Sequence, residues 1–137
     1  MKQLLFFCCL LFSFHFSQAQ KVPYNVVFDL TSKDTNMHTT VIRWLDGISK
    51  DDPTAKLEVV LYGQSLDLVQ KNKSAAAADM QRLMQNPNIQ FAVCAVAMKK
   101  HNVNTADLLP GVRVVPDGIY EIKKKKKAGW GYIKAVQ

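Results

Sequence analysis

Residues 91–98 read FAVCAVAM, a short apolar run with a single thiol in its middle. The turn-forming sequence NPN at 86–88 precedes this run, and a basic segment at 99–102 follows it. The run is too short to cross a membrane, but it fits a buried strand at about 89–93 that ends near Cys94 and continues into a short helix. In open α/β sheets, ligands and reactive groups collect just beyond the carboxyl ends of such strands. Cys94 is therefore either a reactive sulfur or a small buried hydrophobic residue.

A helix that begins directly after Cys94 would direct the free N–H groups of its first turn toward the sulfur. This arrangement favours the thiolate over the thiol. The four residues that follow Cys94 offer no side chain that can act as a base. Activation is therefore expected from backbone amides and from the positive charges of Lys99 and Lys100, with His101 as a weaker aid.

Strands and helices are predicted to alternate on both sides of the run. Continuous apolar, β-prone segments predict further strands at residues 22–30, 57–62, 112–115 and 130–133. Helical spacing and strong helix formers predict helices at residues 35–49, 65–70, 74–85 and 119–127, with Ser74 as the N-cap of the helix at 74–85. This alternation is typical of βαβ units. We predict an α/β fold, a three-layer α/β/α sandwich around a five-stranded, mostly parallel sheet of flavodoxin-like type.

The first 19 residues have the pattern of a secretory signal peptide. Lys2 supplies the positive start, residues 4–16 are apolar, and SQA at 17–19 is a small-x-small cleavage site. Cleavage would leave one domain at 20–137, in the periplasm or otherwise exported. A retained membrane anchor is the alternative, although an apolar segment of this length spans a bilayer poorly.

Removal of the signal peptide also changes the cysteine count. Two of the three cysteines lie within it, so the mature chain keeps only Cys94. One cysteine can form neither an internal disulfide nor a structural zinc site by itself. The mature chain has the length of one ordinary domain and can bury a sizeable core without disulfides.

Signals for other kinds of chemistry are missing from the sequence. No glycine-rich phosphate loop or nucleophile elbow is present, so no nucleotide, flavin or other cofactor is expected. His38 and His101 have no partner at metal-ligand spacing and are predicted to be ordinary solvated or capping histidines, so no metal is expected.

Five consecutive lysines at 123–127 contribute to a formal net charge of +7. The run ends a predicted helix, where cations suit the helix dipole, and it has no interleaved aromatic residues. We expect a solvated helix face, with docking to an acidic partner as the main alternative. Neither nucleic acid nor a stable membrane anchor is expected among the partners.

Several short motifs together resemble the DsrE/DsrF-like family of sulfur-relay proteins. In chain order they are VVFDLTS at 26–32, EVVLYG at 58–63, FAVCA at 91–95, DLLPGV at 107–112, VPDGI at 115–119 and GWGYI at 129–133. The resemblance covers essentially the whole mature chain. It implies a three-layer α/β sandwich and an oligomer, often a trimer or hexamer. It also implies that Cys94 accepts a sulfane sulfur as a persulfide and passes it on.

Three functions follow as hypotheses. The first is a periplasmic sulfur carrier that uses Cys94 and exchanges sulfur with donor and acceptor proteins. The second is a binding module with a pocket near Thr31, Ser32, Gly63 and Cys94 that holds a small anion or a partner without covalent chemistry. The third is an oligomeric interaction protein in which Cys94 belongs to the core.

Overall fold

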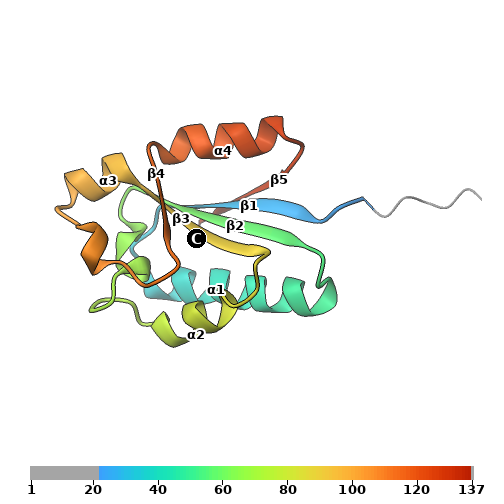
Figure 1. Cartoon of the computed structure of the whole chain (residues 1–137), viewed down its shortest axis with the longest axis horizontal. Helices are drawn as coiled ribbons and strands as arrows, with labels where there is room; N and C mark the ends of the chain where they lie inside the picture. Colours follow the sequence, from blue (N-terminus) through green and yellow to red (C-terminus); the bar gives the residue numbers. More distant parts are fainter. Residues whose placement is uncertain (1–21, 137) are drawn as a thin grey trace, which may run out of the picture.

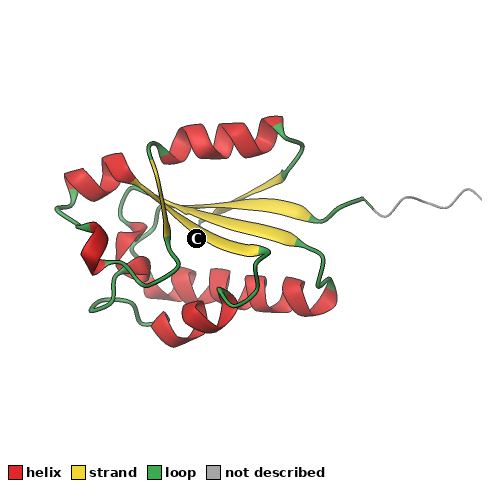
Figure 2. Ribbon diagram, viewed as in Figure 1, coloured by secondary structure: helices red, strands yellow, loops and turns green. Residues whose placement is uncertain are grey.

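The computed structural model describes residues 22–136 and shows strands alternating with helices (Figures 1 and 2). The predicted signal peptide at 1–19, with Lys2 and two cysteines, lies outside the described residues. The strands are β1 (Asn25–Leu30), β2 (Lys56–Leu61), β3 (Ile89–Cys94), β4 (Arg113–Val115) and β5 (Gly131–Ala135). The helices are α1 (Thr35–Asp51), α2 (Ala77–Leu83), α3 (Ala95–Lys100) and α4 (Gly118–Lys127), with 3₁₀ helices η1 (Ser65–Val69) and η2 (Thr105–Asp107). None of these helices is long and apolar enough to span a bilayer.

The five strands form one parallel sheet in the order β4-β3-β2-β1-β5. The chain adds strands in one direction from β1 to β4 and then crosses to the other side of β1 for β5. Parallel crossovers are right-handed, so this reversal places α4 on the face opposite α1 and α2. Figure 1 shows the three layers, with α4 above the sheet and α1 and α2 below it. The predicted α/β/α sandwich with a five-stranded parallel sheet is confirmed.

Side-chain alternation along the strands creates two unequal cores. The larger core lies under α1 and α2 and includes the fully buried Phe28, Leu45 and Phe91. A smaller cluster lies under α4 and consists of Val27, Val60, Ala92, Val115 and Ile122. Full burial of one such aliphatic or aromatic side chain contributes roughly 1.5–3 kcal/mol, so the α1/α2 side supplies most of the apolar stabilisation.

The α4 face also buries a network of ion pairs. Glu58 on β2 is fully buried. Its Oε1 lies 3.0 Å from Arg113 Nη2, and its Oε2 lies 2.6 Å from Lys125 Nζ. Arg113 Nη2 also contacts Glu121 Oε1 at 3.1 Å. Burial alone would raise the pKa of Glu121, but Arg113, Lys124 and Lys125 lower it below its ordinary value. The carboxylates of Glu58 and Glu121 and the cations of Arg113 and Lys125 therefore link the sheet to α4.

This network corrects the prediction for the lysine run. Four of the five lysines are exposed, as expected for a solvated helix face. The side chain of Lys125 is only 17 % exposed, and its Nζ lies 4.2 Å from the centroid of the Trp130 ring. Lys125 is a structural residue because α4 turns it toward the sheet, where Glu58 is its counter-ion.

Most predicted elements are present with shifted ends, and the helix predicted at 74–85 shows the largest shift. Ser74 is not its N-cap, because Ser74 Oγ accepts the N–H of Ala76 at 3.3 Å in the turn before the helix. Helix α2 begins only at Ala77, without a side-chain cap. The first strand begins at Asn25 because Pro23 has no N–H to contribute to a ladder.

Candidate functional site

Cys94 is the last residue of β3 and the N-cap residue of α3, as the sequence predicts. Its thiol is free and its residue surface is 5 % exposed. A cavity of about 210 Å³ nevertheless reaches it, and this Cys94 cavity is lined in part by Tyr62, Gly63, Lys100, His101 and Asp117. All strands are parallel, so the cavity lies at the carboxyl edge of the sheet, where α3 is seen in Figure 1.

Cys94 belongs to the larger core, and its Cβ also lies close to the start of α4. A Cβ atom placed on Gly118, the first residue of α4, would lie 3.2 Å from Cys94 Cβ and 3.2 Å from Val60 Cγ1. The missing side chain at Gly118 therefore allows the start of α4 to approach the cysteine closely. The carboxylate of Asp117 caps the same helix by accepting the N–H of Tyr120 at 2.8 Å.

The predicted contact between the sulfur and the first turn of α3 is not observed. The structure contains no hydrogen bond from α3 to the Cys94 side chain. Of the expected positive groups, Lys100 and His101 line the Cys94 cavity and Lys99 does not.

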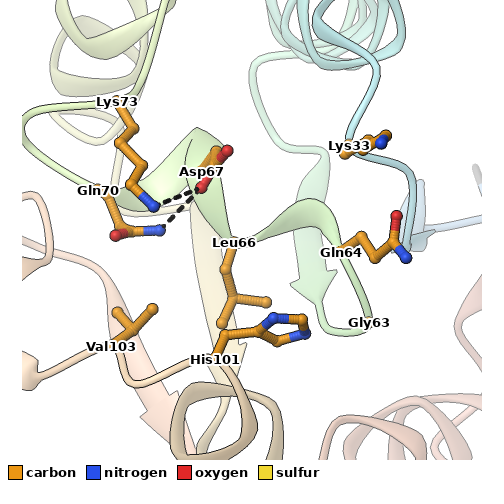
Figure 3. Close-up of a pocket in the computed structure, with 9 residues that line it drawn as sticks. All are labelled: Lys33, Gly63, Gln64, Leu66, Asp67, Gln70, Lys73, His101 and Val103. Carbon is orange, nitrogen blue, oxygen red and sulfur yellow. Dashed lines mark hydrogen bonds and ion pairs between the residues drawn. The ribbon is translucent and has the colours of Figure 1, made fainter.

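A second hollow, the polar cavity, adjoins the Cys94 cavity through the shared residues Gly63 and His101. Its volume is about 340 Å³. On one wall, Asp67 accepts a hydrogen bond from Gln70 at 3.1 Å and pairs with Lys73 at 3.3 Å (Figure 3). Lys33 and Gln64 form the opposite wall, and His101 points into the space below Leu66 (Figure 3).

The structure brings together only part of the predicted pocket of Thr31, Ser32, Gly63 and Cys94. Gly63 and Cys94 share a cavity, whereas Thr31 and Ser32 do not line it. Gly63 has a φ of 63°, a left-handed conformation that makes the sharp turn after β2 and that glycine adopts without strain. Thr31 packs against this turn, so its role is to support the wall.

Ser32 and the two histidines also differ in their roles. The Ser32 hydroxyl accepts the N–H of Asp34 at 3.1 Å, and the Ser32 carbonyl oxygen accepts from His38 Nε2 at 2.8 Å. His38 is thus buried and braces the loop before α1, so it is not a solvated histidine. His101 is exposed at the junction of the two cavities.

A third hollow, the Asp29 groove, lies between α4 and the β1–β5 side of the sheet and has a volume of about 360 Å³. Asp29, Tyr62 and Tyr132 line it on the sheet side. The Tyr132 hydroxyl donates to Asp29 Oδ2 at 2.6 Å. Sequence reasoning missed this cluster, although an acidic residue within the apolar run VVFDL was a usable signal, because such a residue is rarely buried without a partner.

The surroundings of the Asp29 groove raise the pKa values of both tyrosines that line it. The hydrogen bond to Asp29 is the main reason that the pKa of Tyr132 is raised to about 12. Burial, followed by the charge of Asp29, raises the pKa of Tyr62 to about 12. Both phenols are protonated at neutral pH, and the Tyr132 hydroxyl donates the hydrogen bond to the Asp29 carboxylate.

We predict that Asp29→Asn brings the pKa of Tyr132 down from about 12 toward its ordinary value of 10.0, because the main stabiliser of the protonated phenol is lost. A raised folded-state pKa stabilises the protein below the unfolded pKa, and this contribution disappears as the pH rises through the folded pKa. The wild type should therefore lose stability from about pH 10 toward pH 12 more steeply than Asp29→Asn. Ultraviolet titration of phenolate absorbance, with Tyr132→Phe to assign the signal, checks this prediction. An unchanged Tyr132 titration in Asp29→Asn would contradict it.

Within residues 22–136, no group of three or more histidine, cysteine, aspartate or glutamate side chains is arranged to hold a metal ion. The chemistry available in the Cys94 cavity is that of one thiol with the ammonium group of Lys100, the His101 imidazole, the Tyr62 phenol and the Asp117 carboxylate on the same walls.

Comparison with known proteins agrees with this architecture. The structure resembles a protein of unknown function, MTH1491, from Methanobacterium thermoautotrophicum, with a TM-score of 0.76 and 26 % identity over 81 % of this chain and 98 % of that one. It also resembles BT1422 of Bacteroides thetaiotaomicron, a conserved protein of unknown function, with a TM-score of 0.68 and 15 % identity over 81 % and 94 % of the two chains. The ychN protein of E. coli is similar in fold alone, with a TM-score of 0.68 and 9 % identity over 82 % and 99 %.

No curated protein sequence gives a significant match to the chain. The model of the DsrE/DsrF-like family, by contrast, matches residues 12–135, which includes all strands and helices of the sheet domain. The matched range includes the motifs that the sequence shows at β1, β2, β3 and β5. The chain belongs to the DsrE/DsrF-like family.

Proposed function

We propose that this protein is a sulfur carrier that holds a sulfane sulfur as a persulfide on Cys94. The observation that carries the proposal is the position of a free cysteine at the carboxyl end of β3, on a cavity that is lined by Lys100 and His101. Family membership supports a role in sulfur relay. The positive charge of Lys100 at this cavity attracts an anionic sulfur donor, and the Asp117 carboxylate on the same cavity opposes that attraction in part.

The transfer has two balanced steps. The Cys94 thiolate attacks the outer sulfur of a donor persulfide, a Cys94–sulfur bond forms, the donor S–S bond breaks, and the donor leaves as a thiolate. An acceptor thiolate then attacks the outer sulfur of the Cys94 persulfide, and Cys94 returns to the thiolate. Each step exchanges one S–S bond for another, so no external oxidant or reductant is needed.

Transfer must take place between molecules. Cys94 is the free cysteine of the described residues, so no resolving cysteine stands beside it. The polar cavity gives an anionic donor a place next to the thiol, because Lys33 and His101 line it and Gly63 connects it to the Cys94 cavity. The proposal also includes export of the mature protein, supported by the pattern of the first 19 residues, and assembly into a homo-oligomer.

The test combines intact mass with thiol accessibility. Purified protein treated with polysulfide should gain the mass of a single sulfur atom, and a reductant should remove it. Iodoacetamide should modify Cys94 in the native protein, although more slowly than in the unfolded protein because the residue is 5 % exposed. If Cys94 reacts only after unfolding and no sulfur is added, the carrier proposal fails.

The low exposure of Cys94 favours one alternative. A cysteine that belongs to the larger core can be structural, and the adjoining polar cavity would then bind a small anion without covalent chemistry. Thiosulfate that binds reversibly, with no mass added to the protein and with equal affinity for Cys94→Ser, would support this binding module in place of the carrier.

A further inference from the structure

The Asp29 groove has the dimensions and polarity of a small-molecule site. Its volume of about 360 Å³ lies within the usual range for ligand pockets. Four side chains of α4 form one wall: Ile119, Ile122, Lys123 and Lys126. The sheet forms the other wall, where Asp29 lies between Tyr62 and Tyr132.

Asp29 has a hydrogen-bonding capacity that the described residues do not use. The residue is 5 % exposed, and its Oδ2 accepts from the Tyr132 hydroxyl at 2.6 Å. Its Oδ1 is buried and has no hydrogen-bond partner among residues 22–136. A side-chain hydrogen bond to Asp29 is among the causes that raise the pKa of Tyr62, so this phenol lies beside the carboxylate, although no hydrogen bond of standard geometry reaches Oδ1. A buried acceptor without a donor is costly, so a ligand that brings a donor gains that free energy on binding.

The cations of the groove lie on the opposite wall from Asp29. Lys126 Nζ lies 4.8 Å from the centroid of the Tyr132 ring, and Lys123 is one helical turn away on the same side of α4. Among the described residues, neither lysine forms an ion pair with Asp29. Lys125, in contrast, is already paired with Glu58, so one of the five lysines is structural and two others line the groove.

We propose that the Asp29 groove binds a small zwitterion of the α-amino-acid type, with its ammonium group on Asp29 Oδ1 and its carboxylate at Lys123 and Lys126. An ammonium donor suits Oδ1 because charge-assisted hydrogen bonds are roughly twice as strong as neutral ones. A purely anionic ligand would meet the Asp29 carboxylate, and a purely cationic one would meet the two lysines. Ile119 and Ile122 offer apolar surface for an aliphatic side chain.

This site goes beyond the proposed sulfur chemistry. The Asp29 groove and the Cys94 cavity share Tyr62 and Ile119 as a common wall, yet the groove is not lined by Cys94. Binding of the zwitterion therefore needs no thiol, and either proposal can fail without the other.

The test is calorimetric titration of the purified protein with L-leucine. Two matched probes lack one charge each: isocaproate lacks the amine and isoamylamine lacks the carboxylate. L-leucine should bind, and each probe should bind at least about tenfold more weakly, because each leaves one buried or cationic group of the groove unpaired. L-alanine, which lacks most of the apolar side chain, should bind with intermediate affinity.

Variants locate the site. Asp29→Asn should weaken L-leucine binding at least about tenfold, and a Lys123→Gln, Lys126→Gln double variant should weaken it while leaving isoamylamine binding unchanged or stronger. Lys127→Gln and Cys94→Ser should bind as the wild type does. Circular dichroism and urea unfolding confirm that each variant is folded. No binding of either amino acid at millimolar concentration, or binding that is unchanged in folded Asp29→Asn, overturns the proposal.

Discussion

The Cys94→Ser variant is expected to take up no sulfur from polysulfide, whereas the wild type gains the mass of one sulfur atom. Only the thiol can form the S–S bond of a persulfide, and a serine hydroxyl at the same position is not nucleophilic enough toward sulfur. The expected effect is therefore complete loss, in contrast to a graded decrease. Peptide mapping should place the added sulfur on the segment that contains Cys94.

The same variant is expected to remain folded. Serine is close to cysteine in shape, so the tight approach of Gly118 to this position is preserved. The cost is that of a hydroxyl at a position with 5 % exposure, which is about 1–3 kcal/mol if the hydroxyl finds no partner. Circular dichroism and urea unfolding separate this cost from the loss of sulfur uptake. Sulfur addition at an unchanged level in folded Cys94→Ser would show that Cys94 is not the carrier.

The second large effect is on stability. Lys125→Met should lower the free energy of unfolding by about 2–3 kcal/mol, because it removes the ammonium group 2.6 Å from the fully buried Glu58. Loss of one partner of a fully buried ion pair costs about 3–5 kcal/mol. The expected value is smaller here because Arg113 still contacts Glu58 at 3.0 Å and Lys125 is itself 17 % exposed. Loss of the contact between the Lys125 ammonium group and the Trp130 ring adds a smaller part of this decrease in stability.

Lys127→Met is the matched control for this prediction. It makes the same chemical change two residues along the same helix, at an exposed position, and should change stability by no more than about 0.5 kcal/mol. Urea unfolding of the two variants, monitored by circular dichroism, gives the comparison. A double variant that also carries Glu58→Gln should recover part of the loss, because no unpaired buried charge remains. Equal stability of the two single variants would mean that Arg113 alone neutralises Glu58.

Local signals were sufficient to predict where Cys94 lies in the fold. The run at 91–98 changes from β-prone residues to the helix formers alanine and methionine at the cysteine, so the boundary between β3 and α3 is encoded within a few residues. The alternation of strand and helix along the chain similarly determined the parallel α/β sandwich, because a parallel neighbour requires a crossover. These features depend on residues that are close in sequence.

Side-chain direction and partner choice were decided by tertiary structure. The sequence of β3 does not show that Cys94, which belongs to the larger core, also lies close to the start of α4 at Gly118. Lys125 and Glu58 meet only because α4 crosses β2, and a run of identical lysines contains no signal that selects one of them.

The Asp29 groove likewise depends on contacts between residues that are far apart in the sequence, which local sequence signals do not predict. The sequence by itself determined an acidic residue in a buried strand and a tyrosine in the last strand. Only the insertion of β5 beside β1, where Asp29 pairs with Lys134 in the ladder, brings the Tyr132 hydroxyl to Asp29 across a separation of 103 residues. The physical reason is that strand type is set by local periodicity, whereas strand order is set by which faces and edges remain to be covered once the rest of the chain has packed.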